Sequence, residues 1–275
     1  MHDHIARYLA AREARGIAPR TLYQDRYHLD DFARSVDKPP SEIRVEDIED
    51  YLVDCRHLAV TTRRVRRATL HAFFGWLHGR GVVAANPVSG VAVPRVARKQ
   101  PTYYEPEQAA RLLQGIADPR DRLLAIILLR HGQRIASVLA LRWEQVDLDK
   151  ARISYPPHKG GPPLRLALDL DTARQLKAWK ALARSEWVFP GYNGGHLSYT
   201  RAYRNLRDAA RRAGLQWRGA HEFRRTCITT LLQMGEPLHV VSARVAGHSN
   251  VATTTRYYAG VDDEDVGAAI RRLPY

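Results

Sequence analysis

The sequence has little cysteine and no long apolar run. Cys55 and Cys227 are its two cysteines, too few for a disulfide framework or a cysteine-based metal site, so a reducing compartment is expected. The longest apolar run, residues 123–129, is far shorter than a membrane-spanning helix requires. The N-terminus intersperses charges among its apolar residues and lacks a signal-peptide core. We therefore expect a cytoplasmic protein with no membrane-spanning segment, and set aside secreted and integral membrane proteins.

Acidic residues are scarce relative to basic ones. Asp and Glu number 29 against 43 Lys and Arg, giving a net charge of +14, and only six of the 43 are lysines, so 37 are arginines. Such an excess predicts an anionic partner, with nucleic acid as the first choice and a membrane surface as the second. The length of 275 residues, with 45% hydrophobic and 26% charged residues, is typical of a soluble globular protein of about two domains.

The chain divides at a segment rich in helix-ending residues. Residues 86–101 contain Pro87, Pro94 and Pro101, show little periodicity and end in a basic tail, as interdomain linkers do. The boundaries that follow are a helical domain over 1–93, a linker over 94–101 and a second domain over 102–275.

Helical periodicity dominates the first domain. Apolar residues recur at helical spacing in residues 22–33 and again in 70–77, and Thr61 or Thr62 is a plausible N-cap for the second helix. Four arginines precede its apolar stripe: Arg63, Arg64, Arg66 and Arg67. They are either a solvated helix start or DNA-binding residues that contact phosphates.

The second domain mixes helices with a small sheet. Residues 123–129 predict a buried helix closed by Gly132, and residues 135–141 a short helix. Residues 152–155 and 164–168 predict two strands, joined by a hairpin with Lys159 near its tip. Further helices are expected over 171–182, 198–213, 221–234, 237–246, 251–258 and 262–272. The fold class is mainly α with a small antiparallel β-sheet.

Four short segments of the second domain carry candidate chemistry. They are residues 132–135, 159–161, 221–226 and 247–258. Each alone has an ordinary structural explanation, such as a helix C-cap at Gly247 or a solvated lysine in a hairpin. Their order and spacing together are far more specific.

In that order, the segments resemble those of the tyrosine recombinase (phage integrase) family, most of all its Xer-like and integrase-like bacterial members. The family pattern of Arg, Lys, His-x-x-Arg, His and Tyr falls on Arg134, Lys159, His221, Arg224, His248 and Tyr257. The nine-residue step from His248 selects Tyr257 over Tyr258. The resemblance covers nearly the whole chain and implies a SAM-like, core-binding N-terminal domain followed by an α-rich catalytic domain.

The chemistry of a DNA phosphodiester suits two of these arginines. Attack at phosphorus builds negative charge on the non-bridging oxygens, which a metal-free enzyme must meet with fixed donors. Guanidinium is permanently charged and bidentate toward phosphate. Arg134 and Arg224 are therefore assigned as the phosphate clamp, and His248 would add a hydrogen bond.

Proton transfer and attack fall to the other three residues. Lysine can release a proton to the leaving 5′ oxygen when neighbours lower its pKa, so Lys159 is the expected general acid. A tyrosine hydroxyl needs a cationic site or a base to become a nucleophile, and His221 is the expected base or proton shuttle for Tyr257. The resemblance implies a covalent 3′-phosphotyrosine intermediate with no metal, ATP or other cofactor.

The chain departs from the family pattern at four places. Ser137 stands where an acidic residue usually follows the first arginine by three. Glu222 replaces a common Asp, Arg225 a frequent His, and residues 245–246 a bulkier pair. All six catalytic positions are nevertheless occupied, so we expect an active enzyme.

The C-terminus suggests an assembly. After Gly260, an apolar stripe consists of Val266, Ala269, Ile270 and Leu273. The resemblance implies that this terminal helix docks into a neighbouring subunit, giving a homotetramer or heterotetramer on two double-stranded DNA sites, associated with the nucleoid. Chromosome partition by dimer resolution, DNA integration and cassette inversion all share this chemistry.

Three alternatives remain open at this point. A non-catalytic DNA-binding regulator could keep the fold, and a type IB topoisomerase-like relaxase would use the same chemistry at the phosphate. A metal-dependent nuclease with His221 and His248 as ligands is disfavoured, because the carboxylates of a two-metal site do not cluster near these residues.

Overall fold

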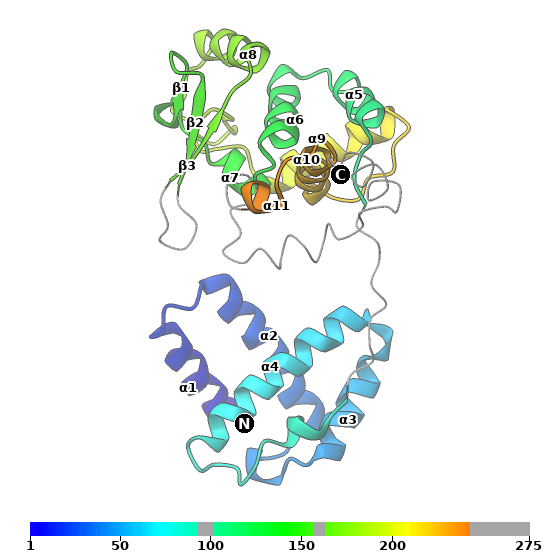
Figure 1. Ribbon diagram of the computed structural model, residues 1–275. Helices are drawn as coiled ribbons and strands as arrows, with labels where there is room; N and C mark the ends of the chain where they lie inside the picture. Colours follow the sequence, from blue (N-terminus) through cyan, green and yellow to red (C-terminus); the bar gives the residue numbers. More distant parts are fainter. Residues whose placement is uncertain (93–101, 157–162, 243–275) are drawn as a thin grey trace, which may run out of the picture. The chain divides into compact units, whose positions relative to one another are not determined.

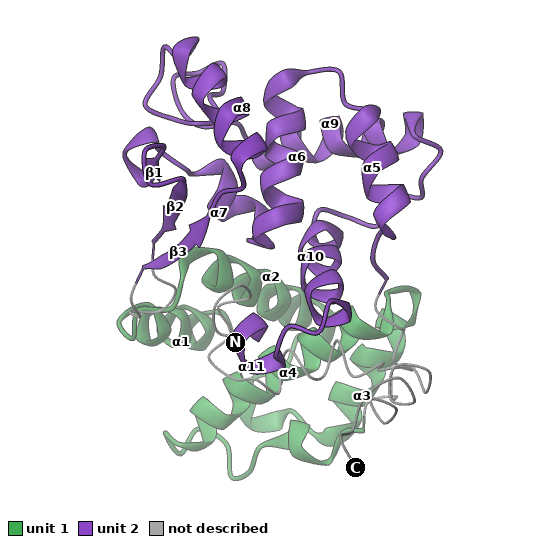
Figure 2. Cartoon of the chain, turned by 45° about the horizontal axis from the view of Figure 1, so that its top comes forward, with its two compact units in different colours: residues 1–99 green, residues 100–275 purple. Residues whose placement is uncertain are grey.

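The computed structural model describes residues 1–92, 102–156 and 163–242. It divides into two compact units, residues 1–99 and residues 100–275 (Figure 2). Each unit has its own hydrophobic core, so each is described by itself.

The first unit is a four-helix arrangement, which confirms the predicted helical class. Its helices are α1 (His2–Glu13), α2 (Pro19–Val36), α3 (Val45–Asp54) and α4 (Val60–His78), with short 3₁₀ turns at Pro40–Glu42, Cys55–His57 and Pro87–Gly90. Helix α2 packs against the other three. Phe32, Phe73 and Phe74 are fully buried and meet edge to face, as aromatic rings in a core prefer.

Helix α4 starts earlier than its sequence predicts. We expected Thr61 or Thr62 as N-cap, which is wrong: Ala59 occupies that position without a side-chain cap. The first turn closes through the Arg63 N–H and the Ala59 carbonyl at 3.1 Å, a bond that needs no capping side chain. The predicted apolar stripe over 70–77 is confirmed, with all four of its large residues completely buried.

The second unit is built around one apolar helix. Its helices are α5 (Pro106–Gln114), α6 (Pro119–His131), α7 (Ile135–Leu139), α8 (Leu170–Ala181), α9 (Tyr199–Arg212), α10 (His221–Gln233) and α11 (Leu238–Val240). Helix α6 is buried along residues 123–128 and packs against α5, α7, α8, α9 and α10. Figures 1 and 2 show it between the sheet and α5. A helix that is apolar on all sides belongs in such a central place.

The sheet has one strand more than predicted. Strands β1 (Val146–Asp147), β2 (Arg152–Tyr155) and β3 (Leu164–Ala167) form an antiparallel sheet in that order, with Ile153 opposite Leu166. The two predicted strands are confirmed, whereas the two-residue β1 is too short to show a period. The Lys159 hairpin tip and the predicted helices beyond residue 242 lie outside the described residues.

No helix in the described ranges combines the length and apolarity that crossing a bilayer demands.

Candidate active site

The first candidate residue follows the central helix. Helix α6 ends at Gly132, whose φ of 58° is left-handed and therefore suits glycine. Two residues later, Arg134 is the N-cap of α7 and is exposed. Its carbonyl accepts the N–H of Ser137 at 2.9 Å, so the residue at the usually acidic position contributes to the helix start through its main chain.

Helix α10 brings the His-x-x-Arg pair to the same turn. His221 is the first residue of α10 and is exposed, whereas Arg224, one turn along, is only 2% exposed. Arg224 Nη1 donates to the Gly132 carbonyl oxygen at 2.7 Å. This charge-assisted bond fixes the first turn of α10 against the turn that presents Arg134.

The charges around His221 show that these groups converge. Partial desolvation of the ring lowers the pKa of His221, although the residue is exposed, and the guanidinium groups of Arg224, Arg225 and Arg134 lower it further. His221 is therefore neutral at neutral pH, and its unprotonated ring nitrogen can accept a proton. A neutral imidazole therefore lies in a field of three cations, an arrangement suited to accepting a proton beside a bound anion.

This arrangement predicts how His221 titrates. Its imidazole is expected to titrate below the usual value of 6.5, and Arg134→Met is expected to raise that pKa by removing one nearby cation. The measurement is NMR titration of the histidine ring carbons, with His221→Gln assigning the signal. Arg130→Met is the matched control, because Arg130 pairs with Asp169 at 2.6 Å and does not act on His221. An equal response to both variants would contradict the convergence.

Tyr104 lies near Glu222 of α10, but its environment makes it a poor nucleophile. Tyr104 is 4% exposed, and burial together with the charge of Glu222 raises its pKa to about 12. Its hydroxyl has no hydrogen-bond partner within the described residues. A phenol this buried and this weakly acidic is a poor nucleophile.

The structure thus brings together three of the six predicted catalytic residues, namely Arg134, His221 and Arg224. Lys159, His248 and Tyr257 lie outside the described residues.

The four predicted DNA-binding arginines divide into two kinds. Arg66 is 6% exposed and bonds Asp31, the Tyr51 hydroxyl and Cys55 Sγ.

Arg67 donates to the carbonyls of Val91 at 2.8 Å and Val88 at 3.0 Å. Arg64 is exposed, and Arg63 is half-buried. The first unit thus uses Arg66 and Arg67 in internal contacts, and their contact with phosphates stays a prediction. Helix geometry explains this: both lie on the stripe that continues into the core.

Sequence reasoning missed a row of arginines on α9. Arg201, Arg204 and Arg211 are exposed, and Arg207 is half-buried. Arg207 pairs with neighbouring Asp208 at 3.2 Å, while no ion pair in the described ranges engages the exposed three. Their spacing of three to four residues places them on one face of the helix, a signal that the sequence already carries.

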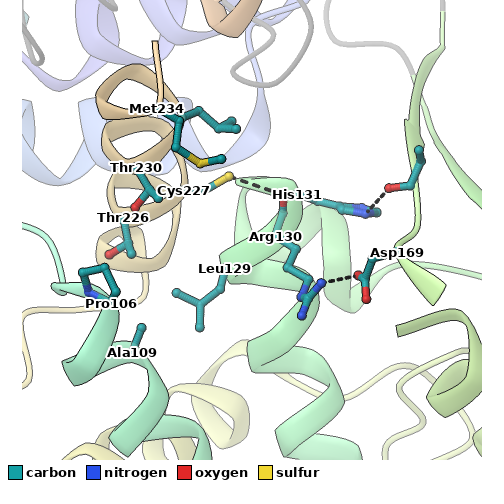
Figure 3. Close-up of a pocket in the computed structure, with 12 residues that line it drawn as sticks. Pro106, Ala109, Leu129, Arg130, His131, Asp169, Thr226, Cys227, Thr230 and Met234 are labelled. Carbon is teal, nitrogen blue, oxygen red and sulfur yellow. Dashed lines mark hydrogen bonds and ion pairs between the residues drawn. The ribbon is translucent and has the colours of Figure 1, made fainter. Parts of the chain in front are cut away.

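A surface pocket of about 500 Å³ lies beside α10, separate from the candidate catalytic residues. It lies between α5, α10 and the end of α6 (Figure 3). His131 Nε2 is 3.1 Å from the Ala167 carbonyl, and Cys227 Sγ donates to the Arg130 carbonyl at 3.4 Å. Burial lowers the pKa of His131 to about 4, so this histidine stays neutral. None of Arg134, His221 and Arg224 lines the pocket.

The described parts of the chain hold no group of three His, Cys, Asp or Glu side chains placed to bind a metal ion.

Comparison with known proteins supports the resemblance to the phage integrase family. The description "Phage integrase family" matches residues 103–264, and "Phage integrase, N-terminal SAM-like domain" matches residues 5–82. The tyrosine recombinase XerC of Xanthomonas campestris is 27% identical over 210 residues, covering 74% of this chain and 65% of that protein. The XerC of Xylella fastidiosa is 28% identical over 215 residues, covering 75% and 72%. The chain thus spans about two thirds of the length of such relatives.

Solved structures share the fold. A lambda integrase dimer bound to a COC′ core site has a TM-score of 0.80 at 18% identity, covering 96% of this chain and 77% of that one. The Tn1549 transposon integrase in complex with circular intermediate DNA has a TM-score of 0.78 at 16% identity, covering 98% and 99%. Since the first family description alone spans more than half of the sequence, the chain belongs to the phage integrase family.

Proposed function

We propose that the protein is a site-specific DNA recombinase that cleaves and rejoins strands through a 3′-phosphotyrosine. The observation that carries the proposal is the convergence of Arg134, His221 and Arg224 around one turn of the second unit. Family membership supports it. Residues 102–275 form the catalytic domain, residues 94–101 the linker and residues 1–93 the core-binding domain.

The chemistry follows from the charges. The Tyr257 phenolic oxygen attacks phosphorus, and the phenolic proton passes to neutral His221. The bond from phosphorus to the 5′ oxygen breaks, and Lys159 protonates that oxygen. Arg134, Arg224 and His248 stabilise the charge on the non-bridging oxygens. The phosphotyrosine conserves the energy of the broken bond, so religation needs no added nucleotide.

Double-stranded DNA is the proposed partner. The net charge of +14 and the exposed arginines of α9 supply the phosphate contacts that non-specific affinity requires. In the first unit, Arg64 is the leading DNA-binding residue, with Arg63 beside it. These contacts position the protein and do not specify bases.

Assembly on two DNA sites is proposed as a tetramer. Among proteins of the same fold are a lambda integrase dimer on a core site and a lambda integrase tetramer on a Holliday junction. The apolar stripe of residues 266–273 is the proposed contact between subunits. With such a DNA partner, the proposed location is the cytoplasm, at the nucleoid.

The test is capture of the covalent intermediate. The protein is incubated, with EDTA present, with a library of nicked duplexes whose short cleaved strand diffuses away. An SDS-stable adduct is expected, and sequencing of the trapped ends gives the site. No adduct on any library member would leave a DNA-binding regulator. Adduct formation with supercoil relaxation by monomers on single sites would instead indicate a topoisomerase-like relaxase.

A further inference from the structure

A buried carboxyl group lies between the two candidate catalytic residues of α10. Glu222 is 1% exposed, and neither of its oxygens has a hydrogen-bond partner of good geometry among the described residues. Burying a carboxylate without such partners is costly. A group of this kind in a native structure calls for an explanation, and the proposed proton transfers do not use it.

Two guanidinium groups flank this carboxylate. Arg218 Nη1 is 3.9 Å from Glu222 Oε1, and Arg225 Nη1 is 3.8 Å from Glu222 Oε2. The Thr102 side chain lowers the pKa of Glu222 more than either guanidinium group does, and the charge of Glu222 raises the pKa of the Tyr104 phenol. Glu222 therefore holds one cation from the segment before α10 and another from the next turn of α10.

The helix start itself lacks a side-chain cap. Ala220 is the N-cap of α10 and has no capping side chain, and Glu222 is the one acidic residue in the first turn. Gly219 just before it has a φ of 104°, a backbone conformation that favours glycine. The Glu222 N–H donates to the Gly219 carbonyl at 3.1 Å. The favourable interaction of a negative charge with the helix dipole at an N-terminus offsets only part of the cost of burying Glu222.

We propose that Glu222 is a positioning residue that fixes the first turn of α10, so that His221 and Arg224 face the phosphate together. Through Arg225 it also keeps a cation beside His221. The inference rests on the proposed function only in taking a phosphate as the ligand. This role accounts for an ionisable side chain at a buried position where an uncharged side chain would give a more stable protein.

The energetic signature of this role is a gain in activity at the expense of stability. Burial raises the pKa of Glu222, against the opposing effects of Thr102, Arg225 and Arg218. For an acid with a raised pKa in the folded state, the destabilisation is full above that pKa and fades as the carboxyl takes up a proton. Replacement by the isosteric, neutral Gln removes it.

The experiment compares Glu222→Gln with Glu107→Gln in the full chain. Glu107 is the matched control because it is also the second residue of its helix, α5, but is exposed. Three quantities are measured: the melting temperature between pH 5 and 8, the His221 pKa by NMR, and the affinity for inorganic phosphate read on the His221 signal. None of them requires DNA cleavage, so the result is independent of the recombinase assay.

Glu222→Gln is expected to melt at the same or a higher temperature than the wild type at pH 7.5, with the difference shrinking toward pH 5. Its His221 pKa is expected to rise toward 6.5, since Arg225 is released, and its phosphate affinity to fall about tenfold. Glu107→Gln should match the wild type throughout. An unchanged His221 pKa and phosphate affinity would overturn the proposal. A lower melting temperature accompanying both changes would also overturn it, because Glu222 would then be a stabilising residue.

Discussion

Tyr257→Phe is expected to abolish the covalent protein–DNA adduct, with cleavage falling on the order of 10⁴-fold or more. The substitution deletes the one atom that would bond to phosphorus and leaves the arginines in place. DNA affinity should therefore stay within about twofold, since the phosphate contacts are electrostatic. The measurement is SDS-stable adduct formation on a nicked site, with affinity determined separately by fluorescence anisotropy.

The neighbouring tyrosine provides the matched control for that prediction. Tyr258→Phe makes the same chemical change one residue later and is expected to retain the adduct. Tyr104→Phe is a second control, because Tyr104 is buried and its pKa is raised to about 12. If Tyr258→Phe abolished the adduct and Tyr257→Phe kept it, the nucleophile assignment would be wrong. If neither substitution abolished the adduct, the phosphotyrosine mechanism would be abandoned.

Arg66→Met is expected to destabilise the first unit by about 2–3 kcal/mol, somewhat less than a fully buried ion pair. The discount reflects Asp31, whose side chain is 32% exposed and can be partly rehydrated. Loss of the guanidinium also leaves the Tyr51 hydroxyl and Cys55 Sγ without their shared donor. For a domain of this size, the melting temperature should fall by roughly 10 °C or more. Calorimetry of the full chain measures it.

The pH dependence of the stability lost in Arg66→Met follows from the titration of Asp31. Although burial opposes it, hydrogen bonds from Arg66 and Tyr51 hold the pKa of Asp31 below its usual 3.8. For an acid with a lowered pKa in the folded state, the stabilisation is full above the unfolded value and disappears as pH falls through the folded value. The difference in melting temperature between Arg66→Met and the wild type should therefore become smaller below about pH 4.

Arg64→Met separates stability from DNA binding on the same helix. Arg64 is exposed two residues before Arg66, so its substitution should change stability by less than about 0.5 kcal/mol. Its DNA affinity should become less salt-dependent, with the slope of log K against log salt reduced by about one. A stability loss equal to that of Arg66→Met would show that exposure does not distinguish the two arginines.

Periodicity predicted the fold well where packing and sequence agree. The stripe over residues 70–77 and residues 123–128 of the apolar run are buried as expected, because helices bury the residues that recur at their own period. The two four-residue strands follow the same logic. The start of α4 and strand β1 were missed, since a main-chain bond closes the first and two residues cannot show alternation.

The arginines show where such reasoning stops. Sequence composition identifies a basic chain, but it cannot separate Arg66, whose charge is neutralised inside a unit, from Arg64, which meets solvent. That difference depends on Asp31 and Tyr51, which are distant in the sequence and come close only after folding. The Glu222 environment is similar: its flanking cations are visible in the sequence, but its burial is not.

The bond from Arg224 to the Gly132 carbonyl has a consequence for how this site tolerates mutation over evolutionary time. Its acceptor belongs to the polypeptide backbone, which every amino acid supplies, so genetic drift cannot delete it as it can delete a carboxylate. A change of the residue at position 137, which is serine here, leaves this anchor in place. Side chains around the turn can then change without removing the acceptor that holds Arg224.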